Sequence, residues 1–146
     1  MAAVERVGVR LSAFLSAKSR APLAWGRDDC LMDVADWALA LTGVDPAAPW
    51  RGTYDDESGA DAILAAHGGL VGLLDYGLVA AGWRRTCAPQ PGDIGAIDVR
   101  TDRGPALTGA IRCGGRWACR GLKGRALIRA GAVAAWTWRS ESCPRP

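Results

Sequence analysis

Hydrophobic residues in the first part of the chain recur at the three- and four-residue spacing of amphipathic helices. The first helix carries one such stripe, which consists of Val4, Val7, Leu11, Phe14 and Leu15. It ends before Pro22, because proline disfavours helix in the residue that precedes it. A second helix starts near Asp28 and Asp29, either of which can cap it, and is stopped by Gly43 and Pro46. Two shorter helices are predicted in residues 55–69 and 70–78.

After Gly82 the pattern changes to that of short strands. The predicted strands are residues 94–100, 106–113, 116–119 and 130–139. Gly114 and Gly115 form a two-residue hairpin turn between the second and third of these segments.

Helices followed by consecutive short strands favour an α+β fold, in which N-terminal helices pack on one face of a C-terminal antiparallel sheet. We expect a single domain over residues 1–146, with a helical part at about 1–82 and a strand part at about 83–139. No internal repeat or long linker divides the chain.

Composition supports a single folded domain. The chain has 146 residues, of which 49% are hydrophobic and 23% charged, so it can bury a core and is not disordered. No apolar run approaches the roughly 20 residues of a membrane span. Because Glu5, Arg6 and Arg10 interrupt the first ten residues, we expect no signal peptide and synthesis in a cytoplasm.

Charge is distributed unevenly along the chain. Eleven acidic and six basic side chains precede Trp83, which gives −5, whereas 12 basic and four acidic side chains from Trp83 onward give +8. The positive residues are spread singly or in pairs along predicted strands, so solvated strand faces are favoured over a nucleic-acid site.

The cysteines and the single histidine do not form a metal-binding pattern. The cysteines are Cys30, Cys87, Cys113, Cys119 and Cys143. None lies in a C-x-x-C pair and only His67 offers an imidazole, so we predict no metal site, no cofactor and mostly reduced cysteines. Five tryptophans could stack on sugars, but their spacing favours a place in the core: Trp37, Trp83, Trp117, Trp136 and Trp138.

The segment Trp25-Gly26-Arg27-Asp28-Asp29-Cys30 is the strongest candidate for chemistry. It places Cys30 in the first turn of a helix, where unpaired N–H groups and the helix dipole favour a thiolate nucleophile. The two adjacent aspartates oppose that effect. On these residues alone, a buried small side chain is favoured over a nucleophile.

The same segment resembles the nucleophile motif of the NlpC-type cell-wall cysteine hydrolases, and Pro91-Gly92-Asp93 is similar to the step into that family's sheet. The chain is still more similar to a small, uncharacterised family found among phage and prophage tail genes. The matching features are Trp25-Gly26-x-x-Asp29-Cys30, Ala35-Asp36-Trp37, Gly43-x-Asp45-Pro46, Arg51-Gly52-x-Tyr54, Gly68-Gly69-Leu70, Gly92-Asp93 and Ala135-Trp136. The resemblance implies a papain-like, NlpC-like fold.

The chain departs from the hydrolases at the catalytic base. The resemblance places the base histidine at a position that here reads Leu107-Thr108; Leu107 cannot act as a base, and Thr108 is a poor substitute. The third, orienting group would lie on the next strand, where Trp117, Ala118 and Cys119 supply none. His67, the only imidazole, could act as the base, but its place at the end of a predicted helix favours a role at the helix C-terminus. Cys30 is therefore a candidate or relic nucleophile.

The resemblance therefore implies a structural or assembly component of a phage-like tail, at its tip, made in the host cytoplasm. Other tail proteins would be its partners. The candidate docking faces are the loop Trp50–Tyr54 and the basic strands around Arg112, Arg116 and Arg120. The alternative is an active amidase or peptidase that cleaves peptidoglycan with Cys30. Nucleic acid as a partner is disfavoured, because the chain has no recognised binding motif.

Overall fold

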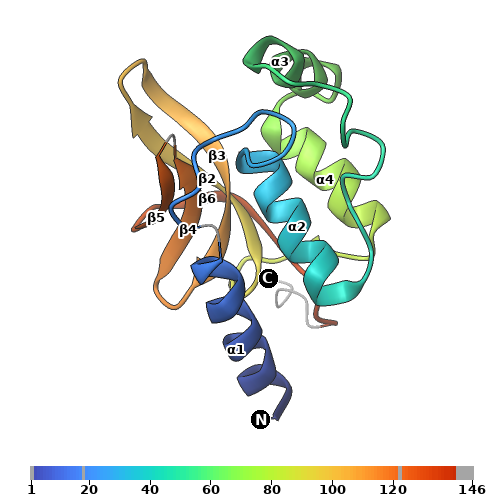
Figure 1. The fold of residues 1–146 in the computed structure, drawn as a ribbon. Coiled ribbons are helices and arrows are strands. Elements are labelled where there is room, and N and C mark those ends of the chain that lie inside the picture. The colour runs from blue at the N-terminus through green and yellow to red at the C-terminus, as the bar shows by residue number, and fades with distance from the viewer. Residues whose placement is uncertain (1, 18, 122, 141–146) are drawn as a thin grey trace.

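The computed structural model describes residues 2–17, 19–121 and 123–140, and over them the chain forms four helices and then six strands (Figure 1). The helices are α1 (Ala2–Ser16), α2 (Cys30–Thr42), α3 (Glu57–Ala66) and α4 (Leu70–Ala80). The strands are β1 (Arg84–Arg85), β2 (Ile94–Thr101), β3 (Gly104–Cys113), β4 (Arg116–Gly121), β5 (Gly124–Ile128) and β6 (Ala132–Thr137). The predicted α+β class is confirmed.

Helix boundaries follow the predicted caps. Asp29 is the N-cap of α2, and Gly43 ends that helix in the left-handed conformation with φ +79°. The Asp56 side chain accepts from the Gly59 N–H and caps α3 in the same way. Polar caps therefore fix the starts of α2 and α3, and a glycine fixes the end of α2.

The six strands form one antiparallel sheet in the order β1-β6-β2-β3-β4-β5. The hairpin across Gly114-Gly115 pairs Cys113 with Arg116, as predicted. The two edge strands, β1 and β5, were not predicted from the sequence. The last strand was predicted over residues 130–139, whereas β6 spans only Ala132–Thr137.

The main core lies between the helices and one face of the sheet, and α2 makes its closest approach to β3. A Cβ atom at Gly109 of β3 would lie 2.9 Å from the Cys30 carbonyl oxygen, so the glycine permits this approach. The Trp37 indole N–H donates to the Gly92 carbonyl at 2.7 Å, which ties α2 to the entry of β2. These contacts fix the start of α2 relative to the sheet.

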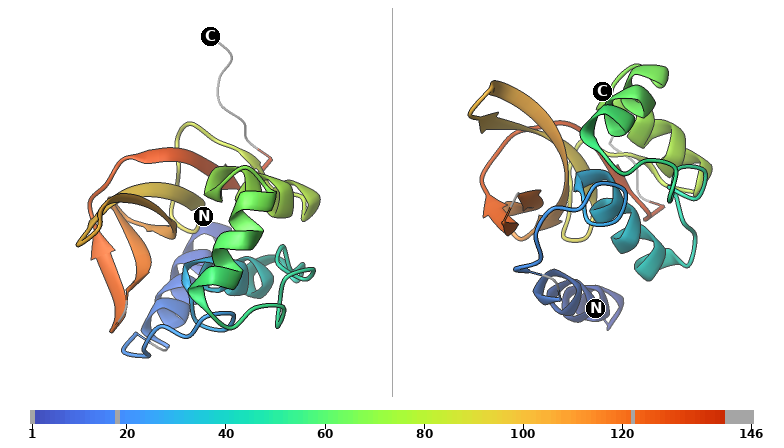
Figure 2. Two further views of the ribbon diagram at one scale, coloured as in Figure 1. Left: turned by 90° about the horizontal axis from the view of Figure 1, so that it is seen from above. Right: turned by 45° about the horizontal axis from the view of Figure 1, so that its top comes forward.

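A second, smaller core fills the other face of the sheet, which is strongly curved (Figure 2). The Trp117 ring covers Gly95, where an added Cβ would lie 2.6 Å from the indole. Four of the five predicted core tryptophans are buried, and they are Trp37, Trp83, Trp117 and Trp136. The core interpretation of these four is confirmed, whereas Trp138 is half-buried against the ring of Trp83.

Three cysteines are free thiols, namely Cys30, Cys113 and Cys119. Cys87 is disulfide-bonded, so the prediction of mostly reduced cysteines holds for three of the four described cysteines, and Cys143 lies outside the described residues. Within the described ranges no single helix has the length and apolar character needed to cross a membrane; only α3 and α4 taken together, bent by 73°, meet that criterion.

Candidate functional site

Cys30 is the first residue of α2, at the end of the helix that meets the sheet. The preceding residue, Asp29, is almost completely buried. Its Oδ1 accepts from the N–H groups of Leu31 and Met32, at 3.0 and 2.8 Å. The carboxylate of Asp29 therefore uses the helix N–H groups that would otherwise be available to stabilise a thiolate or an oxyanion.

The second oxygen of Asp29 holds the turn before the helix. Oδ2 accepts from the Gly26 N–H at 2.7 Å and from the Tyr54 hydroxyl at 2.5 Å. Gly26 has φ +83°, and a Cβ there would lie 2.2 Å from the Tyr54 carbonyl oxygen. Only glycine fits this position, because any side chain would meet backbone in a strained conformation. Burial and the charge of Asp29 raise the pKa of Tyr54, so its hydroxyl remains a donor.

Loop 45–54 is held against α2 by a second carboxylate cluster. Arg51 donates through Nε to Asp45 at 2.6 Å and pairs through Nη1 with Asp36 of α2 at 2.8 Å. These contacts explain three of the sequence motifs at once, because Asp36, Asp45 and Arg51 each belong to a different one. The loop Trp50–Tyr54 is thus a brace for the Cys30 turn, with Arg51 half-buried and Tyr54 buried.

The Cys30 thiol points to β3. Thr108 and the backbone of Gly109 lie near its sulfur, and both favour the thiolate and lower the pKa of the thiol. Part of the residue reaches the surface, yet burial of the sulfur outweighs these contacts and raises the pKa of the thiol, and the charge of Asp29 raises it further. At neutral pH Cys30 is therefore a protonated thiol and a poor nucleophile.

The position expected to hold the base does face the cysteine. Thr108 contacts the Cys30 sulfur, whereas Leu107 is 40% exposed. A threonine hydroxyl neither ionises nor takes up a proton near neutral pH, so it cannot act as the general base. The structure brings Cys30 and Thr108 together without supplying the imidazole that a cysteine hydrolase requires.

His67 has a different environment. It is the C-cap of α3, and its Nδ1 lies 2.9 Å from the Ile63 carbonyl oxygen. Its ring packs edge-on against Trp50 and Tyr76, at centroid distances of 5.3 and 5.2 Å. The described contacts of His67 thus serve the helix end, as predicted, and none of them is with Cys30.

Two buried ion pairs beside Cys30 were not found from the sequence. Arg125 of β5 forms a bidentate pair with Asp33 of α2, at 2.5 and 2.8 Å, and both side chains are more than 90% buried. Arg120 of β4 pairs with Asp28 at 3.4 Å, and its side chain is 1% exposed. These ion pairs hold β4 and β5 to the start of α2.

The burial of Arg120 corrects the predicted basic docking face. Arg116 is exposed, but Arg112 is half-buried and stacks on the Trp117 ring, 5.1 Å from its centroid. Arg120 belongs to the interior and is unavailable to a partner. The three arginines therefore do not form one exposed surface.

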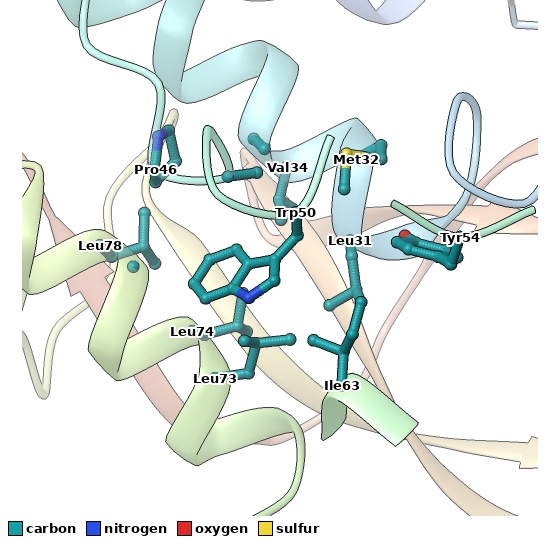
Figure 3. Close-up of a pocket in the computed structure, with 13 residues that line it drawn as sticks. Leu31, Met32, Val34, Pro46, Trp50, Tyr54, Ile63, Leu73, Leu74 and Leu78 are labelled. Atoms are coloured by element: carbon teal, nitrogen blue, oxygen red, sulfur yellow. The ribbon is translucent and has the colours of Figure 1, made fainter. Parts of the chain in front are cut away.

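An apolar cavity of about 30 Å³ lies beside Leu31, between α2, α4 and loop 45–54 (Figure 3). Trp50 lies across it, with Leu73, Leu74 and Ile63 around the ring. The cavity is too small for a substrate and is lined almost entirely by apolar side chains, so it is a packing gap and not a substrate site. No group of three or more metal-ligating side chains lies close together within the described parts of the chain.

Comparison with known proteins gives one match. A family model described as a domain of unknown function, DUF6950, matches residues 3–138. No curated protein and no solved structure matches the chain.

Proposed function

We propose a non-catalytic role for this chain, which belongs to the DUF6950 family of domains of unknown function. In this proposal the chain is a structural or assembly component of a phage-like tail. Its scaffold is papain-like and NlpC-like and has lost its catalytic base. The observation that carries the non-catalytic part is that the residue beside the partly buried Cys30, at the expected position of the base, is Thr108. A nucleophile without a base cannot complete acyl transfer, because both attack and departure of the amine need proton transfer.

The motifs support a scaffold role. Asp29 and Tyr54 hold the Cys30 turn, and Arg51 holds the adjacent loop through Asp36 and Asp45. These residues belong to four of the seven features that carry the resemblance to the tail-gene family, and their contacts stabilise the fold around Cys30. Retention of such a frame without a base fits a domain that works through its surface. The assignment to a tail rests on that resemblance alone.

Hydrolysis of peptidoglycan is the alternative, with Cys30 as nucleophile. Its support is the position of Cys30 at the start of a helix, with Thr108 and the Gly109 backbone near the sulfur, where both favour the thiolate. Wild-type chain and the Cys30→Ser variant should both fail to cleave purified muropeptides. Cleavage by the wild type that disappears in Cys30→Ser would establish the hydrolase and overturn the non-catalytic proposal.

The tail assignment needs a separate test. Particles purified from the source of the gene should contain the chain in fixed amount, detected by mass spectrometry, and Cys30→Ala should leave particle yield and infectivity unchanged. Absence of the chain from purified particles would contradict the tail role. Loss of infectivity in Cys30→Ala would return the assignment to the hydrolase.

A further inference from the structure

A groove of about 520 Å³ lies between α1 and the edge of the sheet. One wall is α1, with Leu11, Ser12 and Leu15, and the other includes Arg125 and Leu127 of the edge strand β5. This volume lies in the range of specific binding sites and greatly exceeds the apolar cavity beside Trp50.

The outer edge of β5 offers backbone groups to a partner. The Arg125 N–H donates to the Ser19 carbonyl at 2.8 Å, so the backbone of Arg125 points away from β4. Because backbone direction alternates along a strand, the N–H and C=O of Leu127 also point outward. Within the described residues, the outer edge of β5 makes one backbone hydrogen bond, that between Arg125 and Ser19. The backbone N–H and C=O of Leu127 remain open to a partner beside the groove.

The side chains in the groove call for an occupant with both apolar and acceptor groups. Leu127 is 51% exposed, although it faces the groove. Arg125 is 95% buried, and its Nε has no hydrogen-bond partner among the described residues, since Asp33 engages only the two terminal nitrogens. A buried N–H without an acceptor is costly, and a ligand oxygen would satisfy it.

Charge defines the partner further. The exposed charged side chains described in residues 6–20 and 113–130, around the groove, are all basic: Arg6, Arg10, Arg20, Arg116, Lys123 and Arg129. Arg120 and Arg125 are excluded because they are buried and paired with Asp28 and Asp33. Exposed positive side chains flank both ends of β5, at Lys123 and Arg129, and Arg20 lies against Gly124. Like charge disfavours a second copy of β5 as the occupant, and the groove exposes no aromatic ring on which a nucleic-acid base could stack.

We propose that this groove binds an acidic, extended peptide segment of a partner protein, which adds to the sheet as a strand alongside β5. Backbone pairing at Leu127 gives affinity, apolar side chains fill the groove, and carboxylates meet the basic rim. The inference rests on the proposed assembly role, because it names how an assembly partner is held.

The test mixes the full chain with a fluorescent, acetylated octapeptide of alternating Glu and Val. Fluorescence anisotropy of the peptide measures binding. We expect binding that weakens as salt rises, and no binding of the same peptide N-methylated along its pairing edge. Leu127→Glu should weaken binding at least tenfold through charge repulsion. The matched control, Val133→Glu, introduces the same charge at a residue that is 54% exposed on β6 and should change binding less than twofold.

Three results would overturn the proposal: no binding of the Glu-Val peptide at millimolar concentration, equal effects of the two variants, or equal binding of the N-methylated peptide. Binding of a 15-residue oligothymidylate in preference to the peptide would assign the groove to nucleic acid instead. None of these outcomes involves Cys30, so they are distinguishable from failure of the non-catalytic proposal, which the muropeptide assay decides.

Discussion

Replacement of Tyr54 by phenylalanine tests the brace that holds the Cys30 turn. The substitution removes a single hydroxyl, which donates to the buried carboxylate of Asp29 at 2.5 Å, and keeps the ring beside Gly26 and the Cβ beside Gly59. Asp29 retains its three backbone donors, from Gly26, Leu31 and Met32. The loss is therefore one charge-assisted hydrogen bond in a site closed to water.

Such a bond contributes about 1.5–3 kcal/mol, so Tyr54→Phe should lower the free energy of unfolding by about 2 kcal/mol. For a chain of this size that corresponds to a fall in Tm of roughly 4–8 °C. Urea and thermal unfolding followed by circular dichroism measure both quantities.

The chain offers a matched control. Tyr76 is 62% exposed, so Tyr76→Phe should change stability by no more than about 0.5 kcal/mol. If Tyr54→Phe were as stable as the wild type, or if Tyr76→Phe lost as much, the role assigned to the Tyr54–Asp29 contact would be wrong.

Three further substitutions examine other parts of the account. Gly26→Ala should lower the free energy of unfolding by roughly 3 kcal/mol or more, because at φ +83° it adds a Cβ 2.2 Å from a carbonyl oxygen. Gly43→Ala, with φ +79° but open space around it, should cost only about 1 kcal/mol in urea unfolding. Equal losses would contradict the contact argument. Arg125→Met should cost about 3–5 kcal/mol by leaving the buried Asp33 unpaired, and the double variant Arg125→Met/Asp33→Leu should recover most of that loss; a double variant as unstable as the single would refute the pairing. Thr108→His should place an imidazole on the Cys30 sulfur and speed its alkylation at pH 7 at least tenfold, while Thr108→Ser leaves the rate unchanged; no acceleration would show that Thr108 does not occupy the position of the base.

Local sequence signals predicted the helices and the central strands because those elements depend on local chemistry. Asp29, Asp56 and Gly43 cap or stop helices through contacts within a few residues, and Gly114-Gly115 closes a tight hairpin. The same signals predicted that Cys30 begins a helix. They also predicted that Thr108 is a poor base, since residue type alone decides whether a side chain can take up a proton.

The missed features depend on partners distant in the chain. In β5 the arginine at 125 is buried and the leucine at 127 is exposed, which reverses the pattern from which strands are predicted. The burial of Arg125 follows from its pairing with Asp33, 92 residues away, and Arg120 pairs with Asp28 over the same separation. No local pattern distinguishes such an arginine from a solvated one, so the basic docking face was wrong at Arg120.

The pKa of the Cys30 thiol tests the central claim most directly. Alkylation by iodoacetamide, followed by mass spectrometry against pH in a Cys113→Ser/Cys119→Ser background, reports the ionisation of Cys30 alone among the free thiols of the described chain. Burial and Asp29 raise the pKa of Cys30, so the rate should be low at pH 7 and should still be rising above the ~8.5 of an unperturbed thiol. A rate that reaches its plateau below pH 7 would show an activated thiolate, and the account of Cys30 as a catalytically inert residue would be wrong.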